Sequence, residues 1–286
     1  MACIEVKNVS FTYGHKTPFE VQALNDVSFS IEKGEIVSVI GHTGSGKSTL
    51  MQMLNALIKP EHGEIFVNGR NINADKKSVS YARFTVGLCC QYPEYQLFGE
   101  TCFEDIAFGP RNMGLSEAEV KGRVLQAASF VHLKTEKLQV SPFDLSGGQK
   151  RRCAIAGVMA MLPEVLILDE PTAGLDPAGR ASVLRMIQRY KQQTGATVIL
   201  VTHSMEIAAA MSDRILVLNK GTLAYFGTPQ EIFSHGEELI AMGLNVPSFT
   251  KIIVELKKRG FPLEEVYTVE DAAEQIALML KGERGK

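Results

Sequence analysis

Apolar and polar residues near the start of the chain follow patterns that predict short strands. Residues 27–31 alternate strictly between apolar and polar side chains, which is typical of a half-buried strand, and residues 4–9 also indicate a strand. Residues 35–40 form a β-branched run that leads directly into a glycine-rich loop. Residues 49–57 then have a helical pattern that a proline ends. The N-terminal part therefore predicts strands followed by a strand–loop–helix unit.

The second half of the chain contains apolar runs of strand length that are continuous rather than alternating. They are residues 165–168, 197–202 and 214–218. Continuous runs suit strands that are buried on both faces of a parallel sheet. Residues 93–145 instead have helical patterns, with a capping box at residues 116–119. We therefore expect an α/β core that is interrupted by a helical insertion.

The same patterns suggest how the chain is divided into domains. We expect a main domain over residues 1–242, with its helical insertion at about residues 93–160. Residues 243–286 form a C-terminal region, for which we expect two helices, over residues 247–259 and 268–281.

Composition and charge exclude several classes of protein. The chain has 286 residues, with 30 Lys and Arg against 32 Asp and Glu, and this near balance gives no electrostatic reason to expect nucleic acid as a partner. No apolar run approaches the roughly 18 residues that span a bilayer, and the start lacks the features of a signal peptide. The five cysteines form no C-x-x-C pair, which argues against a disulfide framework or a zinc site. We expect a soluble, cytosolic protein that reaches a membrane only through a partner.

The glycine-rich loop is the most specific motif in the chain, because it fits G-x-x-x-x-G-K-[ST] at every fixed position. Its backbone N–H groups can surround the β- and γ-phosphates of a nucleotide, and the helix that follows adds its positive N-terminal end. Lys47 supplies a mobile positive charge, and the Ser48 hydroxyl can ligate Mg²⁺. The expected nucleotide-binding residues here are Gly41, His42, Thr43, Gly44, Ser45, Gly46, Lys47, Ser48 and Thr49.

Two carboxylates follow the buried strand at residues 165–168. Asp169 and Glu170 would lie at the carboxyl edge of the sheet, where ligands of open α/β sheets bind. Asp169 can hold Mg²⁺, and Glu170 can accept a proton from an attacking water. The alternative is that these carboxylates are only the polar end of a strand before a turn at Pro171. An intact phosphate-binding loop in the same chain makes this alternative much weaker.

Three other residues are candidates mainly because of this context. His203 follows the strand at residues 197–202 and can contact the γ-phosphate and orient the attacking water, although a lone histidine is more often structural. Gln91 follows a predicted strand at residues 86–90, and its amide can ligate Mg²⁺ or position water. Tyr13 can stack on an adenine ring, and packing into the core is nearly as good an interpretation.

A second glycine motif precedes another helix. Two glycines and a serine at a helix N-terminus form an anion site. A protein that binds one nucleotide seldom needs two such sites far apart in sequence. The motif therefore indicates a composite site, completed by a second subunit. Its residues are Leu145, Ser146, Gly147, Gly148 and Gln149.

These motifs occur in an order that resembles the ATPase subunits of ATP-binding cassette (ABC) transporters, over roughly residues 3 to 235. In chain order they are Tyr13, residues 41–48, Gln91, residues 145–149, residues 168–170, residues 174–176 and His203. The resemblance implies a P-loop NTPase cassette with a mixed-sheet core, an N-terminal antiparallel β subdomain, a helical insertion and a small C-terminal helical appendage. It also implies ATP and Mg²⁺ as cofactors.

The family resemblance assigns a role to each motif. In this family two cassettes dimerise head to tail, with each ATP between the P-loop of one and the second glycine motif of the other. Ser146, Gly147, Gly148 and Gln149 would thus act on the partner's ATP, and Asp176 would lie at the dimer interface. Glu170 would be the general base, and His203 the γ-phosphate switch. These roles rest on the resemblance rather than on spacing.

A narrower resemblance points to the energy-coupling factor (ECF) transporters. It is carried by residues 91–98, residues 108–114 and the insert at residues 17–20, which is similar to the second of two paralogous ATPases. It implies a paralogous ATPase partner, a transmembrane coupling subunit and a separate substrate-binding membrane subunit that takes up a vitamin or a transition-metal ion. The chain would then be peripheral, at the cytoplasmic face of the cell membrane. Residues 243–286 loosely resemble the dimerisation region of this family.

Two alternatives stay open at this point. One is a homodimeric ATPase of a cobalt or nickel importer. The other is a soluble ABC protein that acts on nucleic acid or ribosomes, which the single cassette and the lack of a basic surplus disfavour. The transported solute cannot be identified, because selectivity would reside in another polypeptide.

The segment after Gln91 is unusually apolar for a loop beside a site. Residues 93–98 predict either a groove for a partner's helix, with Glu94 and Gln96 as its polar rim, or a simple docking of the helical insertion onto the core.

Overall fold

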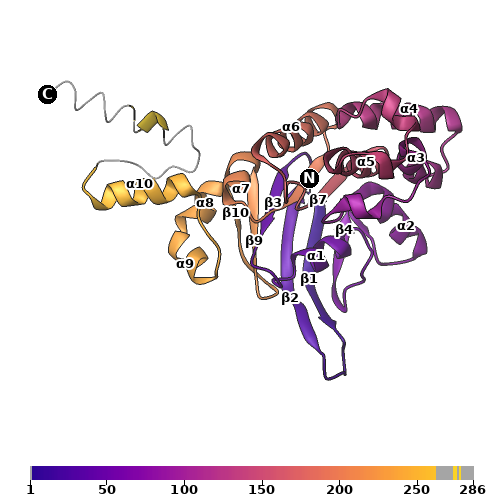
Figure 1. The fold of residues 1–286 in the computed structure, drawn as a ribbon. Coiled ribbons are helices and arrows are strands. Elements are labelled where there is room, and N and C mark those ends of the chain that lie inside the picture. Colours follow the sequence, from indigo (N-terminus) through magenta and orange to yellow (C-terminus); the bar gives the residue numbers. More distant parts are fainter. Residues whose placement is uncertain (1, 262–272, 276, 278–286) are drawn as a thin grey trace.

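The computed structural model describes residues 2–261, 273–275 and 277, and it contains two sheets (Figure 1). The first sheet has the strand order β2-β1-β4-β5 and is antiparallel. Its long hairpin pairs Val6 with Phe29, so that alternate side chains of both strands enter the core. The four strands are β1 (Ala2–Tyr13), β2 (Val21–Glu32), β4 (His62–Val67) and β5 (Arg70–Asn71).

The second sheet has six strands in the order β10-β9-β3-β8-β7-β6. Strands β3, β6, β7, β8 and β9 run parallel, and only β10 is antiparallel to its neighbour. Its central strands are buried on both faces, as the continuous apolar runs predict. The strands are β3 (Ile36–Ile40), β6 (Val86–Cys89), β7 (Val165–Asp169), β8 (Thr197–Val201), β9 (Arg214–Asn219) and β10 (Thr222–Gly227). The predicted mixed core and antiparallel N-terminal subdomain are confirmed.

Helices pack against the sheets and build the predicted insertion between β6 and β7, while the end of the β1–β2 hairpin projects away from them (Figure 1). The insertion contains α3 (Cys102–Asn112), α4 (Glu117–Phe130), α5 (Gly147–Met159) and the 3₁₀ turns η1 (Pro93–Gln96), η2 (Thr135–Gln139) and η3 (Pro142–Asp144). The remaining helices are α1 (Lys47–Leu54), α2 (Lys76–Thr85), α6 (Pro177–Thr194), α7 (Met205–Met211), α8 (Pro229–Ser234), α9 (Gly236–Ala241) and α10 (Ser248–Lys258).

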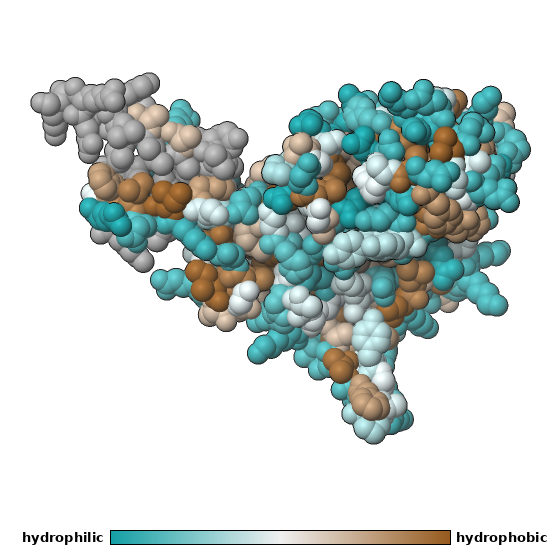
Figure 2. Space-filling model, in the orientation of Figure 1, coloured by the Kyte–Doolittle hydropathy of each residue, from teal (hydrophilic) through white to brown (hydrophobic). Residues whose placement is uncertain are grey.

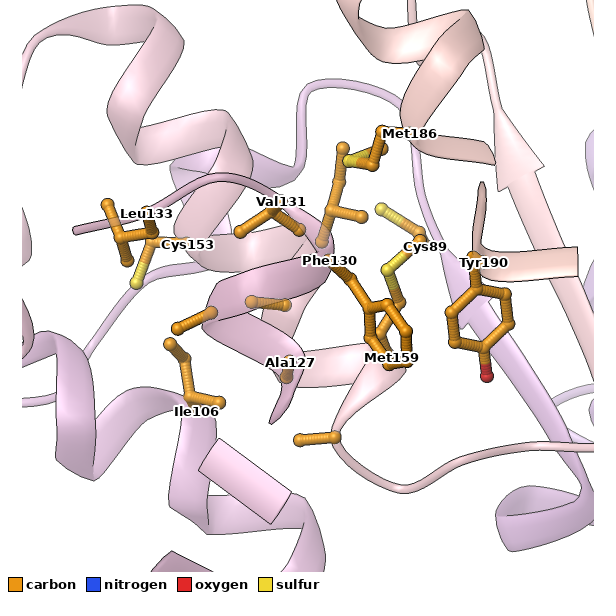
Figure 3. Packing of buried hydrophobic residues seen from close by; sticks show 14 of the residues in the cluster. Cys89, Ile106, Ala127, Phe130, Val131, Leu133, Cys153, Met159, Met186 and Tyr190 are labelled. Atoms are coloured by element: carbon orange, nitrogen blue, oxygen red, sulfur yellow. The ribbon is translucent and has the colours of Figure 1, made fainter. Parts of the chain in front are cut away.

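Buried apolar clusters hold the helical insertion against the sheet. Phe130 from α4 packs edge to face on Tyr190 from α6, with ring centroids 5.1 Å apart, and Met159 and Cys89 pack around them (Figure 3). A second cluster fills the space between the two sheets, and a third joins α7 and β9 to α8 and α9. Full burial of a large apolar side chain stabilises the folded state by roughly 1.5–3 kcal/mol. The clusters therefore hold the helices firmly against the sheets, and with them the loops at the sheet edge.

Several predicted boundaries differ from the structure. The first strand extends to Tyr13 because the whole hairpin pairs, and the first helix covers Lys47–Leu54 rather than residues 49–57. Helix α2 was not predicted, although Asp75 caps it by accepting a 2.7 Å hydrogen bond from the Ser78 N–H. Of the two predicted C-terminal helices, the first is α10, and the second, at residues 268–281, lies mostly outside the described residues. None of the helices described here is long and apolar enough to cross a membrane.

Candidate nucleotide-binding and catalytic site

A cavity of about 350 Å³ opens at the carboxyl edge of the six-stranded sheet. It brings together residues from β1, β2, the glycine loop, α1 and the ends of β6, β7 and β8. Half of the predicted cofactor-binding residues and all of the predicted catalytic ones line it. The lining residues are Tyr13, Val21, Ala23, Thr43, Gly44, Gly46, Lys47, Ser48, Thr49, Gln91, Asp169, Glu170 and His203.

The glycine loop can close around an anion only because two of its positions lack a side chain. Gly46 has φ 98°, and a Cβ there would collide with the Ala23 carbonyl. A Cβ on Gly41 would collide with the Leu218 carbonyl and the Ser45 hydroxyl. The sharp turn of the loop into α1 therefore requires glycine, and it leaves backbone N–H groups free to bind phosphate.

Lys47 is held across the mouth of this loop. Its ammonium group donates to the carbonyl of Gly41 at 2.8 Å and to the carbonyl of His42 at 2.9 Å. Burial lowers the pKa of Lys47, and the nearby carboxylates of Glu170 and Asp169 oppose that shift. A terminal phosphate at this position would give the ammonium an anionic partner in a sheltered place.

Asp169 and Ser48 converge on one point of the cavity. The Ser48 hydroxyl donates to Asp169 Oδ2 at 3.2 Å, and Gln91 lines the same cavity. Burial raises the pKa of Asp169, while the Ser48 hydrogen bond and the Lys47 charge partly offset the shift. A hydroxyl, a carboxylate and an amide oxygen are hard ligands of the kind that Mg²⁺ prefers, so this set fits that ion.

Glu170 and His203 form a direct pair that was not predicted. His203 Nε2 lies 2.8 Å from Glu170 Oε1, with the Glu170 side chain only 14% exposed. Burial raises the pKa of Glu170, and the nearby His203 opposes this shift. The pairing of Asp169 with Val201 in the parallel ladder brings the ends of β7 and β8 side by side. The register of these two neighbouring strands was thus the signal that could have predicted the contact.

Tyr13 closes the other end of the cavity. Its hydroxyl lies 3.3 Å from Thr49 Oγ1, and its ring packs edge to face on Phe11. The ring stays 42% exposed, so it is available for stacking rather than buried in the core. Val21 and Ala23 line the cavity as well and were not predicted. Their spacing of two along β2, which places both on one face of the strand, was the signal for them.

The second glycine motif lies outside this cavity. Ser146, Gly147 and Gly148 are exposed at the N-terminus of α5, where the Ser146 N–H donates to Gln149 Oε1 at 3.1 Å. None of the four lines the cavity that holds the P-loop. Asp176 is also exposed, and it caps α6 by accepting from the Gly179 N–H at 2.7 Å. The second glycine motif of this chain therefore lies apart from the cavity that contains its P-loop.

A second cavity of about 420 Å³ forms a groove between α3, α5 and the segment after Gln91. Pro93, Gln96 and Leu97 line it, as the groove hypothesis predicts. The predicted rim role of Glu94 is wrong, because its side chain is only 16% exposed and pairs with the buried Arg151. Arg151, one turn into α5, therefore keeps the Glu94 carboxylate in the protein interior.

Comparisons with known proteins agree with the fold and the site. The family model described as ABC transporter matches residues 24–173. The ATP-binding protein EcfA2 of the energy-coupling factor transporter is 52% identical in Caldanaerobacter subterraneus subsp. tengcongensis, covering 98% of both chains. The protein of the same name from Clostridium perfringens is 50% identical, covering 97% of this chain and 98% of that one.

Two solved structures match as well. CbiO1 of Clostridium perfringens, described as part of the ABC transporter complex cbiONQ, has a TM-score of 0.75 and 33% identity, covering 91% of this chain and 97% of that chain. A dimeric ATP-binding cassette bound to ADP and phosphate has a TM-score of 0.71 and 28% identity, covering 79% of this chain and 98% of that chain. The chain belongs to the ABC transporter family of ATPases. Within that family it belongs with the ATP-binding proteins of energy-coupling factor transporters, whose ATP hydrolysis is coupled to transport.

Proposed function

We propose that Glu170 is the general base at the ATP-hydrolysis site of this chain, and that a second, paralogous ATPase completes the site. The observation that carries the proposal is the sheltered Glu170 carboxylate, which shares one cavity with the P-loop. A raised pKa brings Glu170 closer to the working pH and so favours its action as a general base.

Each residue of the cavity has a role in this mechanism. Lys47 and the N–H groups of residues 41–48 hold the β- and γ-phosphates, and Tyr13 stacks on the base. Glu170 takes a proton from the attacking water. His203, hydrogen-bonded to Glu170, fixes the carboxylate and faces the γ-phosphate. The chain thus positions its own groups around one phosphoryl bond, which is the main contribution a protein makes to phosphoryl transfer.

We propose Ser48, Asp169 and Gln91 as the residues that hold Mg²⁺. When bound, Mg²⁺ neutralises charge on the β- and γ-phosphate oxygens. The Ser48 hydroxyl and the Asp169 carboxylate are already in contact, so the two ligands need little reorganisation to share an ion. A cation at this place would favour the charged form of Asp169 and so oppose burial, which raises the pKa of this carboxyl.

The exposed motif at residues 146–149 supports a head-to-tail dimer. We propose that Ser146, Gly147, Gly148 and Gln149 bind the ATP held by the partner's P-loop, and that Asp176 lies at the same interface. The partner is a paralogous ATPase, with a homodimer as the alternative. In this arrangement residues 1–242 form the cassette, and residues 243–286 contribute to dimerisation.

We propose that the membrane partners are a transmembrane coupling subunit and a substrate-binding subunit for a vitamin or a transition-metal ion. The names of the relatives, which refer to energy-coupling factor transporters, and the cbiONQ neighbour support this assignment. The chain would sit at the cytoplasmic face of the membrane as a peripheral subunit. The groove of about 420 Å³ beside Gln91 is the surface we assign to the coupling subunit.

Mixed dimers test the composite site. Ser146→Arg in this chain should abolish hydrolysis at the partner's P-loop while this chain's own P-loop still binds ATP. Lys47→Ala should have the opposite pattern, with loss of binding at its own site. Site-specific photolabelling of each subunit with an azido-ATP separates the two. A monomer with full, concentration-independent ATPase activity would overturn the composite model.

A further inference from the structure

A buried arginine near the start of α5 contacts two other segments of the site. The Arg151 guanidinium donates to both oxygens of Glu94, at 2.6 and 3.0 Å, and to the Ala173 carbonyl at 2.6 Å. The Arg151 side chain is 7% exposed. Charged side chains are almost never this buried unless they are paired, so the contacts of this guanidinium are specific.

The three contacted segments each carry part of the proposed machinery. Arg151 lies on α5, directly after the motif at residues 146–149. Glu94 lies in η1, three residues after Gln91. Ala173 lies in the turn between Glu170 and Asp176, and its N–H donates to the Glu170 carbonyl at 3.1 Å. One planar group therefore joins the partner-facing motif, the Gln91 segment and the Glu170 turn.

The same helix also forms one wall of the groove. Ala154 and Val158 follow Arg151 at helical spacing on α5 and line the cavity, which Pro93 and Leu97 also line. Helix α5 is a rigid rod whose N-terminus is the partner-facing motif. A ligand in the groove would therefore contact both elements that carry the Arg151–Glu94 pair, η1 and α5.

The chemistry of the pair makes it move as a unit. Burial of Glu94 alone would raise its pKa, but the hydrogen bonds from Arg151 lower it on balance, so the carboxylate stays charged. A bidentate arginine–carboxylate pair has a fixed planar geometry that lysine cannot reproduce. Displacement of η1 is thus transmitted to α5 and to the Ala173 carbonyl rather than absorbed by a flexible side chain.

We propose that Arg151 is a positioning residue that transmits occupancy of the groove to the motif at residues 146–149 and to the Glu170 turn. Rigid elements and bonded networks of this kind can carry coupling between distant sites. The inference rests on the proposed function, because it takes the groove as the membrane subunit's site.

The test compares ATPase rates of the purified ATPase dimer with those of the full complex reconstituted in lipid. Glu94→Leu combined with Arg151→Met removes both charges at similar volume, a change that buried ion pairs often tolerate without loss of stability. We expect normal ATP binding and normal assembly, and the rate of each variant complex is compared with the basal rate of its own dimer. The factor by which the membrane subunits change the rate should fall to about 1, because groove occupancy no longer reaches the motif at residues 146–149 and the Glu170 turn.

Arg111 provides the matched control. It also pairs with carboxylates, Glu104 and Glu117, but on the exposed surface of α3. Arg111→Met combined with Glu104→Leu should leave the stimulation by the membrane subunits unchanged. Arg151→Lys is a second variant, which keeps the positive charge but loses the planar guanidinium that bonds both oxygens of Glu94. It should reduce the stimulation partly.

Two results would overturn the proposal. One is stimulation of the double variant equal to that of the unchanged complex, with Arg151→Lys also normal. The other is loss of assembly, which would mean that the pair only shapes the groove. Lys47→Ala, measured in the same assays, tests the proposed nucleotide site independently of the Arg151 proposal. If Lys47→Ala still binds and hydrolyses ATP, the proposed site fails, whatever the Arg151 variants do.

Discussion

The imidazole of His203 and the carboxylate of Glu170 lie in contact, with Nε2 and Oε1 2.8 Å apart, at the ends of two adjacent parallel strands. Glu170 has φ 53°, a left-handed conformation that costs an ordinary residue roughly 1–2 kcal/mol. Its N–H still donates to the Val201 carbonyl at 3.0 Å, so the ladder continues through the strained residue. Strain of this kind is often found where a side chain has a functional direction to keep.

Replacement of Glu170 by glutamine tests its role as the base. The amide keeps the size and the hydrogen-bonding ability of the side chain but cannot take a proton from water. We expect Glu170→Gln to bind Mg-ATP normally and to lose roughly 10²–10⁴-fold in turnover, the usual contribution of general-base catalysis. Single-turnover ATPase assays and nucleotide-binding titrations of the dimer measure the two effects separately.

A surface variant provides the control for this prediction. Glu237 is exposed on α9, and Glu237→Gln should leave both turnover and binding unchanged. Turnover of Glu170→Gln close to that of the unchanged dimer would remove Glu170 from the base role. His203→Ala should lower turnover too, because it removes the partner that orients the Glu170 carboxylate.

Much of this site could be predicted from the sequence because its motifs are local. The glycine loop and Asp169–Glu170 each lie directly after an apolar strand, and the ends of parallel strands meet at one sheet edge. Tertiary pairing is what the sequence could not provide. Glu94 and Arg151 are 57 residues apart, and no local pattern distinguishes a buried glutamate from one at a polar rim.

The buried carboxylate of Asp169 should destabilise the protein without nucleotide. Burial raises its pKa, so the folded protein holds this proton more tightly than the unfolded chain does. The free energy of unfolding therefore falls as pH rises from the ordinary value of 3.8 through the raised folded value, and it stays low at neutral pH. Asp169→Asn should then raise stability at pH 7 by a gain on the order of 1 kcal/mol.

Thermal unfolding at several pH values checks this prediction. The advantage of Asp169→Asn should vanish in acid, where the carboxyl is protonated in both states. Asp144→Asn, an exposed change in η3, is the control and should have little effect at any pH. A destabilised Asp169→Asn at neutral pH would show that the hydrogen bond from Ser48 outweighs the cost of burial.

Tyr13 should contribute through its ring and not through its hydroxyl. Tyr13→Ala removes the stacking surface and should weaken ATP binding by about 1–3 kcal/mol, the range for one stacked base. Tyr13→Phe loses only the contact with Thr49 and should bind nearly normally. Equilibrium titration with a fluorescent ATP analogue distinguishes the two. Equal losses in both variants would assign the effect to the hydroxyl contact and contradict stacking.

The exposed aromatic residues beside the groove should bind the membrane partner. Tyr95 is 85% exposed and Phe98 is 61% exposed, and Phe98 packs edge to face on Phe108 with centroids 5.0 Å apart. Phe108 also lines the groove, so exposed aromatic surface continues from the groove onto the segment after Gln91. Figure 2 shows apolar surface on one face of the molecule, including the protruding hairpin between β1 and β2, where Phe19 is 84% exposed.

Arginine at these positions should prevent docking while leaving the ATPase intact. Aromatic residues at the centre of an interface contribute at least about 2 kcal/mol each, which corresponds to roughly a 30-fold loss of affinity. We expect Tyr95→Arg and Phe98→Arg to abolish pull-down with the transmembrane coupling subunit, and Phe19→Arg to have no effect. The ATPase rate of the dimer, measured without membrane subunits, should stay normal in all three. The neighbouring residues Pro93 and Leu97 are buried. If the segment only docks the helical insertion onto the core, these variants would disturb that packing and would lose folding and ATPase activity together. That joint loss, or normal assembly of every variant, would reject the groove as the docking surface.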